Sequence, residues 1–265
     1  MRLPLNSQKS FVLVPKVQLA LILSLINLTA LIHSFSLNTL LNLMVALVSA
    51  VISDLIFLKV RNIKPFFPGA AIVSGLIIAL LVSPDQPLFI PAFAAVLAMF
   101  SKNFIRVGNR HIFNPAAFGL FLSGLLLTFQ VSWWGVSFQQ IFPLSINSFY
   151  LLMLLLPATV SILKLNRHWN IFSFYIVYLA IYIWLNFDRG VNLTSLVDPV
   201  VVFFALVMLP EPMTTPVNYF RQMLFGGFVA ATSFAVSGLP VINTLIPDSL
   251  IIALLMGNLV FFKIR

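Results

Sequence analysis

The residues whose types and spacing could do chemistry lie beside two proline-rich interruptions of otherwise apolar sequence. One interruption begins at 68–75 (Pro-Gly-Ala-Ala-Ile-Val-Ser-Gly) and ends at 81–87; the other begins at 198–202 and ends at 209–216 (Leu-Pro-Glu-Pro-Met-Thr-Thr-Pro). Where Pro or Gly interrupts a helix in apolar surroundings, the freed backbone groups need partners in protein or in a cavity. Two interruptions at corresponding places predict one central site between them. We expect its lining to include Ser74, Gly75, Glu211, Thr214 and Thr215.

The chemistry of this predicted site depends on few groups. The Glu211 carboxylate could accept hydrogen bonds or pair with a cation, and the hydroxyls of Thr214 and Thr215 could bond a ligand or the opened backbone. The alternative is that these prolines only end helices at a membrane surface. No catalytic residue is identified, because the sequence has no Ser-His-Asp arrangement, HExxH, P-loop or GxGxxG. With no cysteine and 3 histidines, we expect no metal site, and haem ligands are poorly supplied.

A third polar feature is the stretch 102–119, which carries four basic or histidine side chains before an apolar run. Asn114 followed by Pro115 predicts a helix start, with Asn as the N-cap and Pro at the first helical position. The basic residues, together with Gly108 and Asn109, could form an anion-binding surface. The alternative is a basic loop before an ordinary cap. We expect Asn109 and Asn114 to shape a loop that enters the central site.

The composition indicates that a membrane surrounds these residues. Of the 265 residues, 61% are hydrophobic and 8% are charged, and the mean hydropathy is +1.08. A soluble domain carries about 25% charged residues, so a water-facing surface of this size could not be covered. Helices that cross a bilayer need about 20 apolar residues. The sequence therefore predicts an all-α integral membrane protein with spans at 17–35, 38–58, 69–83, 88–101, 115–130, 147–163, 171–187, 199–210, 222–238 and 247–262.

The distribution of Lys and Arg predicts the orientation of these spans. When the N-terminus is placed in the cytoplasm, every Lys and Arg except Arg189 falls on the cytoplasmic side, as the positive-inside rule requires. The net charge of +9 therefore reflects topology, and we expect no nucleic-acid partner. We expect a multi-pass protein of the cytoplasmic membrane with both termini in the cytoplasm. Asp54, close to Lys59 near the end of the second span, is expected to reach the interface.

The chain is expected to form a single membrane domain over residues 1–265, because no linker or soluble domain interrupts it. A cytoplasmic segment at 1–16 precedes two halves of five spans each, at about 17–130 and 147–262. An odd number of spans in each half gives the halves opposite orientations. We therefore expect two inverted five-helix repeats in which the third span of each is a broken helix, near 69–83 and 199–210.

Three motifs resemble those of the NqrB/RnfD family, which comprises the B subunit of the sodium-translocating NADH:quinone reductase and the D subunit of the Rnf ferredoxin:NAD oxidoreductase. The segment 108–117 resembles the family's G-x-N-x-F-N-P-A motif. The segment 74–80 resembles its S/T-G-L-L-L-A-L helix. The segment 209–216 resembles its A-T-D-P-V-T-S-P break, with Glu in place of Asp. The resemblance covers about residues 40–262.

The resemblance implies a ten-helix subunit of inverted repeats in a multisubunit redox complex, with a flavoprotein and an iron–sulfur protein as partners. Family members carry FMN on the Thr of an S-G-A-T motif between the fifth and sixth helices. The corresponding region here, 131–147, has no Thr; Ser132, Ser137 and Ser145 offer hydroxyls outside the family's context. We therefore do not carry the covalent attachment over. A flavin held without a covalent bond and a member without flavin both remain open.

The function expected from these features is that of a membrane subunit of an Rnf/Nqr-type electron-transport complex, transferring electrons through a flavin and coupled to ion translocation. One alternative is a small-solute or ion channel or transporter of inverted-repeat type without redox activity. Another is a scaffold that binds a separate flavoprotein through its basic loops.

Overall fold

The computed structural model of the chain describes residues 15–64, 67–137, 162–163, 166–188, 198–239 and 247–264. These residues are almost all helical, apart from one short hairpin and the connecting loops. Most of the predicted sixth span, at 147–163, and most of the predicted cytoplasmic segment 1–16 lie outside the described residues.

The first half of the chain follows the predicted spans closely. Its elements are α1 (Pro15–His33), α2 (Leu37–Val60), α3 (Gly69–Leu81), α4 (Phe89–Phe104), β1 (Arg106–Val107), β2 (Arg110–His111), α5 (Pro115–Leu127) and α6 (Trp134–Ser137). The two strands pair antiparallel in the hairpin between α4 and α5. The hairpin and the four-residue α6 are the elements that the hydropathy pattern does not predict.

The second half contains α8 (His168–Asn186), α9 (Pro199–Phe203), η3 (Phe204–Met208), α10 (Tyr219–Ser237) and α12 (Ser249–Phe261). The predicted broken helix at 199–210 is an α-helical turn, α9, that continues as the π-helical turn η3. π-helical turns are rare and often occur at functional sites. Among the described helices, three have the length and composition to cross a membrane: α1, α2 and α8.

Side-chain caps explain where several of these helices begin. The Asn114 side chain accepts a hydrogen bond from the Ala117 backbone N–H, and Pro115 occupies the first helical position, as the sequence predicts. Asp198 and Asp248 accept from backbone N–H groups at the starts of α9 and α12 in the same way. Such a cap satisfies backbone donors that have no partner inside the helix.

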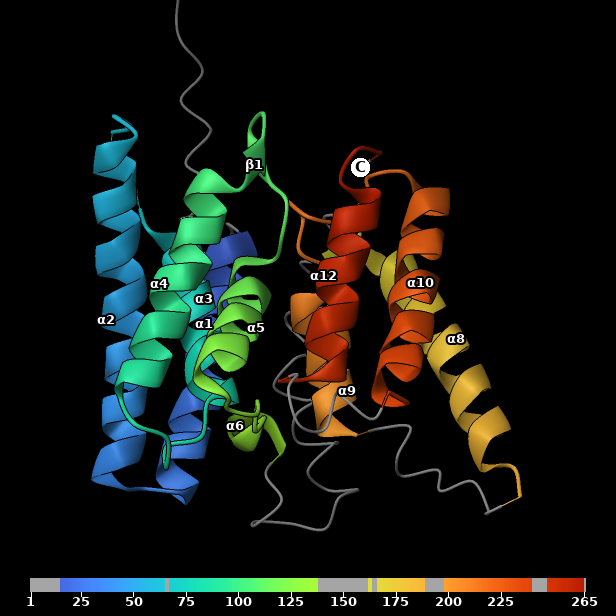
Figure 1. The fold of residues 1–265 in the computed structure, drawn as a ribbon, viewed down its shortest axis with the longest axis horizontal. Helices are drawn as coiled ribbons and strands as arrows, with labels where there is room; N and C mark the ends of the chain where they lie inside the picture. Colours follow the sequence, from blue (N-terminus) through green and yellow to red (C-terminus); the bar gives the residue numbers. More distant parts are fainter. Residues whose placement is uncertain are drawn as a thin grey trace, which may run out of the picture.

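The helices of the two halves stand side by side (Figure 1), those of residues 15–137 on the left and those of residues 166–264 on the right. In the first half, α4 packs against both α2 and α5. In the second half, α10 packs against both α8 and α12 in a corresponding arrangement. Across the middle, α5 contacts α12. The hairpin lies at the same end of the molecule as the end of α2 and the chain's C-terminus (Figure 1).

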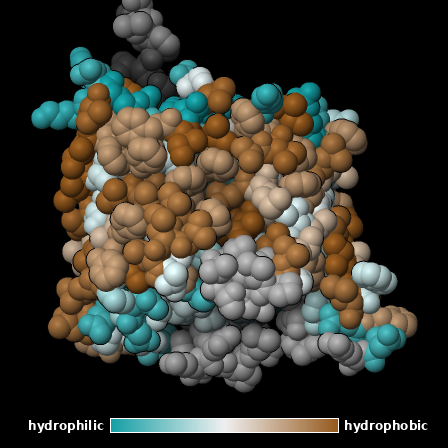
Figure 2. Space-filling model, viewed as in Figure 1, coloured by the Kyte–Doolittle hydropathy of each residue, from teal (hydrophilic) through white to brown (hydrophobic). Residues whose placement is uncertain are grey.

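The sides of the molecule are apolar. Figure 2 shows a broad brown belt of hydrophobic residues between hydrophilic atoms at the two ends. On α4 the exposed side chains form one stripe at helical spacing: Phe89, Phe93, Val96, Phe100 and Phe104. An exposed apolar surface of this extent is stable in lipid and not in water. The chain is a membrane protein.

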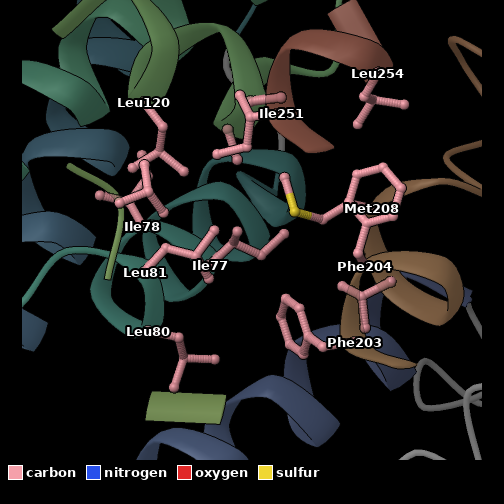
Figure 3. Packing of buried hydrophobic residues seen from close by; sticks show 14 of the residues in the cluster. Ile77, Ile78, Leu80, Leu81, Leu120, Phe203, Phe204, Met208, Ile251 and Leu254 are labelled. Atoms are coloured by element: carbon pink, nitrogen blue, oxygen red, sulfur yellow. The ribbon is translucent and has the colours of Figure 1, made fainter. Parts of the chain in front are cut away.

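The core lies where the two halves meet. Figure 3 shows Ile77 and Leu81 of α3 on the side of the cluster that faces Phe203, Phe204 and Met208 of α9 and η3. Leu80 points away from them and lies close to Gly135 of α6. All of these side chains are almost completely buried. Leu120 of α5 and Ile251 and Leu254 of α12 close the same cluster from another side (Figure 3). The short third elements of both halves therefore contribute to one apolar cluster.

Asparagine side chains satisfy the carbonyls at the ends of these short elements. Asn42 of α2 donates to the carbonyls of Ala79 and Val82 at the end of α3, at 3.1 and 3.0 Å. Asn170 of α8 donates to the Leu209 carbonyl at the end of η3, at 3.3 Å. A carbonyl freed at membrane depth needs such a partner, because no water is available there.

Candidate functional site

A partly open pocket lies between α3, the start of α5, η3 and the loop that follows η3. It measures about 110 Å³. Val73 and Ile77 of α3 and Leu206 and Val207 of η3 supply apolar walls. The polar residues in its lining are Lys16, Ser74, His111, Asn114 and Glu211. An apolar cavity with a few convergent polar groups is the usual form of a small-molecule site.

Ser74 is the polar residue that α3 contributes to the pocket. It is 4% exposed, and its hydroxyl makes no hydrogen bond within the part of the chain that the structure describes. A buried hydroxyl normally has a partner. Ser74 is therefore a group that a ligand in the pocket could satisfy. In the sequence, Ser74 belongs to the first interruption, at 68–75.

His111 and Glu211 join the two halves at the pocket. The His111 Nε2 atom lies 2.8 Å from Glu211 Oε1, although the residues are 100 positions apart. His111 is buried on the hairpin strand β2, and Glu211 is the acidic residue of the second interruption. The sequence identifies Glu211 as a hydrogen-bonding or cation-pairing residue, but it gives no indication that His111 is the partner. The pairing depends on how the hairpin folds over the loop.

Thr214 and Thr215 support Glu211 from outside the pocket lining. Both threonines are fully buried. The Thr215 hydroxyl donates to the Glu211 carbonyl at 2.8 Å, and the Thr214 hydroxyl lies 3.3 Å from Glu211 Oε2. Their backbone N–H groups also donate to the Glu211 carbonyl. The sequence allows these hydroxyls to bond either a ligand or the opened backbone. In the structure they bond the backbone and the side chain of Glu211.

Arg167 holds the same loop from the start of α8. Its guanidinium donates to the carbonyls of Pro212 and Pro216. Burial, with a further contribution from the positive charge of Arg110, lowers the pKa of Arg167. Sequence analysis assigns Arg167 only to a basic cytoplasmic loop. The prolines of 209–216 are the signal in the sequence for such a donor. Because proline has no backbone N–H, carbonyls of this loop lack backbone partners and need a side-chain donor.

Asn114 connects three elements beside the pocket. Besides capping α5, its side chain donates to the Met208 carbonyl of η3 at 3.2 Å. Its backbone N–H donates to Asn258 Oδ1 of α12 at 2.8 Å. Asn258 is fully buried and does not stand out in the sequence. The structure thus brings together Ser74, Asn114 and Glu211, supported by the two threonines.

Like the two threonines, Gly75 and Asn109 are predicted for the site but do not line the pocket. Gly75 faces α2, where a Cβ atom would lie 2.9 Å from the Leu47 Cα atom, so it permits close helix packing. Asn109 is exposed in the turn of the hairpin. Its carbonyl accepts a hydrogen bond from Arg106 Nη2 at 2.6 Å. Both residues shape the elements around the pocket without contacting it.

The structure corrects the prediction for Asp54. Its carboxylate does not reach the interface beside Lys59; it is 1% exposed and lies between α2 and α4. Lys102 Nζ lies 2.8 and 2.7 Å from its two oxygens, and Asn103 donates to Oδ1 at 2.9 Å. Lys102 belongs to the last turn of α4 and is also buried. A buried carboxylate of this kind requires a cation and hydrogen-bond donors.

In the NqrB/RnfD family, which the motifs resemble, the flavin-attachment motif lies in the region that corresponds to 131–147. Of this region the structure describes residues 131–137. The Ser132 hydroxyl donates to the Leu81 carbonyl at 3.1 Å, and the Ser137 hydroxyl to the Trp134 carbonyl at 3.3 Å. Ser145 lies outside the described residues. Within the described segments, no group of three His, Asp or Glu side chains could hold a metal ion.

The comparisons with known proteins agree with the sequence motifs. The model of the NQR2, RnfD, RnfE family matches residues 10–141, about half of the chain. The matched part includes Ser74, His111 and Asn114, and it ends before Glu211. No curated protein matches the chain. Its motifs, its membrane helices and this match agree, and the chain belongs to the NQR2, RnfD, RnfE family.

Proposed function

We propose that this chain is a membrane subunit of an Rnf/Nqr-type electron-transport complex, in which it transfers electrons coupled to ion translocation. The observation that carries the proposal is the pocket between α3 and the loop after η3. Two of the motifs that identify the family contribute Ser74 and Asn114 to its lining. The proposed partners are a flavoprotein and an iron–sulfur protein of the same complex.

The proposed architecture is one domain over residues 1–265 with ten spans in two inverted five-helix repeats. The asparagine caps support it, because Asn42 and Asn170 lie near the starts of the second helices of the proposed halves. Each donates to the carbonyls that end the third element of its half. The packing of α4 between α2 and α5 and of α10 between α8 and α12 supports it as well. The proposed location is the cytoplasmic membrane, with both termini in the cytoplasm.

The pocket has the groups to hold a flavin without a covalent bond. Its apolar walls suit a planar ring, and the Ser74 hydroxyl and the Lys16 ammonium suit polar substituents. When bound, a flavin such as FMN would supply one- and two-electron transfer. The chain's own residues position the site: Asn114 ties α5 to η3, and the bond between His111 and Glu211 fixes the hairpin over the loop.

Visible absorbance of the native complex tests this proposal. We expect the protein, purified with its neighbouring subunits, to show flavin absorbance that is lost after Ser74→Val and weakened after Glu211→Gln. Ser123→Ala is the matched control, because Ser123 is a buried serine of α5 whose hydroxyl donates to the Gly119 carbonyl at 2.6 Å, away from the pocket. A native complex without flavin would overturn the redox role of this chain.

A channel or transporter is the second candidate, because inverted repeats with short central helices also build small-solute pathways. The apolar core between the halves does not favour this candidate. Ile77 of α3 faces Phe203, Phe204 and Met208 within one buried apolar cluster (Figure 3). A polar solute that passed between α3 and η3 would have to open this contact. Ile77 and Val207 belong both to the pocket lining and to this apolar cluster.

Flux into liposomes distinguishes the two candidates. We expect the purified chain to give no flux of sodium or of small neutral solutes above that of empty liposomes. Flux that Glu211→Gln changes would favour the channel. A chain without flux and without flavin, which nevertheless captures a separate flavoprotein, would favour the scaffold alternative.

A further inference from the structure

Two guanidinium groups meet at the last turn of α4, away from the pocket. Arg61 caps the end of α2, and its Nη1 atom lies 3.4 Å from Asn103 Oδ1. Arg106 begins the hairpin, and its Nη1 atom donates to the Lys102 carbonyl at 3.3 Å. Because residues 102 and 103 are adjacent in the chain, the two arginines lie close together on one end of the α2–α4 pair.

No carboxylate neutralises this pair within the described parts of the chain. The nearest acid on these helices, Asp54, is already occupied by Lys102 and Asn103. The ion pairs of the described residues are Lys102–Asp54 and His111–Glu211, and neither includes an arginine. The Arg106 Nε–H group is buried and has no hydrogen-bond partner there. Two like charges and an unused donor make a place where an anion would be stabilised.

The electrostatic consequence is visible at Arg106. Burial, followed by the positive charge of Arg61, lowers the pKa of Arg106. A bound anion would offset the repulsion between the two guanidinium groups, because it would attract both of them.

The surface beside the arginines is apolar and aromatic. The rings of Phe57, Phe100 and Phe104 form a cluster at the same end of α2 and α4, with centroids 5.3 Å apart for Phe57–Phe104 and 5.2 Å for Phe100–Phe104. Phe100 and Phe104 are each 42% exposed and belong to the lipid-facing stripe of α4. In Figure 2 the hydrophilic atoms at this end of the molecule border directly on the brown belt.

We propose that Arg61 and Arg106 bind the phosphate of an anionic phospholipid whose acyl chains lie against Phe100 and Phe104. Guanidinium groups suit this ligand, because they donate paired hydrogen bonds to phosphate oxygens. A lipid is favoured over a free phosphate because the charges lie at the edge of a lipid-facing aromatic surface. Basic groups between membrane helices at the interface are the usual recognition element for anionic headgroups.

Lipid titration of the purified chain in detergent, followed by native mass spectrometry, tests the proposal. Dioleoyl phosphatidylglycerol is the probe, and phosphatidylcholine and inorganic phosphate are run as separate arms. Each basic residue near a headgroup contributes about fivefold to affinity. We therefore expect Arg61→Gln with Arg106→Gln to weaken phosphatidylglycerol binding by roughly 30-fold, while phosphatidylcholine binding does not change.

Lys263→Gln is the matched control, because Lys263 is an exposed cation near the C-terminus, where its Nζ atom lies 5.7 Å from the Phe262 ring centroid. An equal loss of affinity in this variant would overturn the proposal, since any basic residue would then serve. Displacement of the lipid by millimolar inorganic phosphate would also overturn it in favour of a soluble anion. If the double Gln variant does not fold, Arg61→Lys with Arg106→Lys keeps the charges; it should retain phosphatidylglycerol binding, and complete loss would contradict charge recognition.

Discussion

The sequence predicts that Asp54 reaches the interface near Lys59, whereas the structure pairs it with the buried Lys102. The stability of a Lys102 variant distinguishes these two arrangements. We expect Lys102→Met to destabilise the protein strongly. The substitution removes the two contacts at 2.8 and 2.7 Å and leaves the carboxylate with the Asn103 amide as its remaining donor. Because Asp54 is 1% exposed, water cannot replace the lost ammonium.

The magnitude follows from the burial of the charge. Breaking a buried ion pair by removing one partner costs about 3–5 kcal/mol. For a chain of this size, that corresponds to a fall of about 6–20 °C in the unfolding temperature. Replacing both members, Lys102→Met with Asp54→Asn, should recover more than half of the loss, because no charge is then left buried. Lys59→Met is the matched control, since Lys59 is close to Asp54 in sequence but exposed.

Thermal unfolding of the detergent-solubilised protein, followed by size-exclusion chromatography of the heated samples, measures these differences. The structure predicts that Lys102→Met lowers the midpoint and that Lys59→Met leaves it within 2 °C or so, as for most surface substitutions. The reasoning would be refuted if Lys59→Met were the more damaging change, or if the double variant were as unstable as the sum of the single ones.

Two further predictions use the same unfolding assay. Gly119→Ala should cost about 1–3 kcal/mol, because its Cβ atom would overlap the Ala94 carbonyl oxygen of α4 and lie 2.9 Å from the Ala98 Cβ atom. Gly238→Ala, whose nearest contact is at 3.6 Å, should be tolerated; equal effects would contradict the packing argument. Asn170→Ala should cost about 1–3 kcal/mol, because a buried carbonyl at the end of η3 loses its donor; an unchanged midpoint would show that this cap is dispensable.

The sequence by itself determines the helices. Nine of the ten predicted spans coincide with described helices to within a few residues, because hydropathy, proline and asparagine act within one or two helical turns. The cap at Asn114 and the two interruptions are local features of the same kind. The membrane setting and the family also follow from the sequence, since they depend on composition and on short motifs.

Only the tertiary structure decides which polar groups meet. Glu211 is identifiable in the sequence, but its partner His111 is 100 residues away, and Asp54 pairs with a lysine 48 residues away and not with its sequence neighbour Lys59. Gly75 is another example: the sequence predicts it for the site, but in the structure it packs against α2. Hydropathy fixes that a helix is buried in the membrane, but it does not fix which neighbour each face contacts. A few buried polar groups in an apolar interior must find partners, and the packing of distant segments determines which partners are within reach.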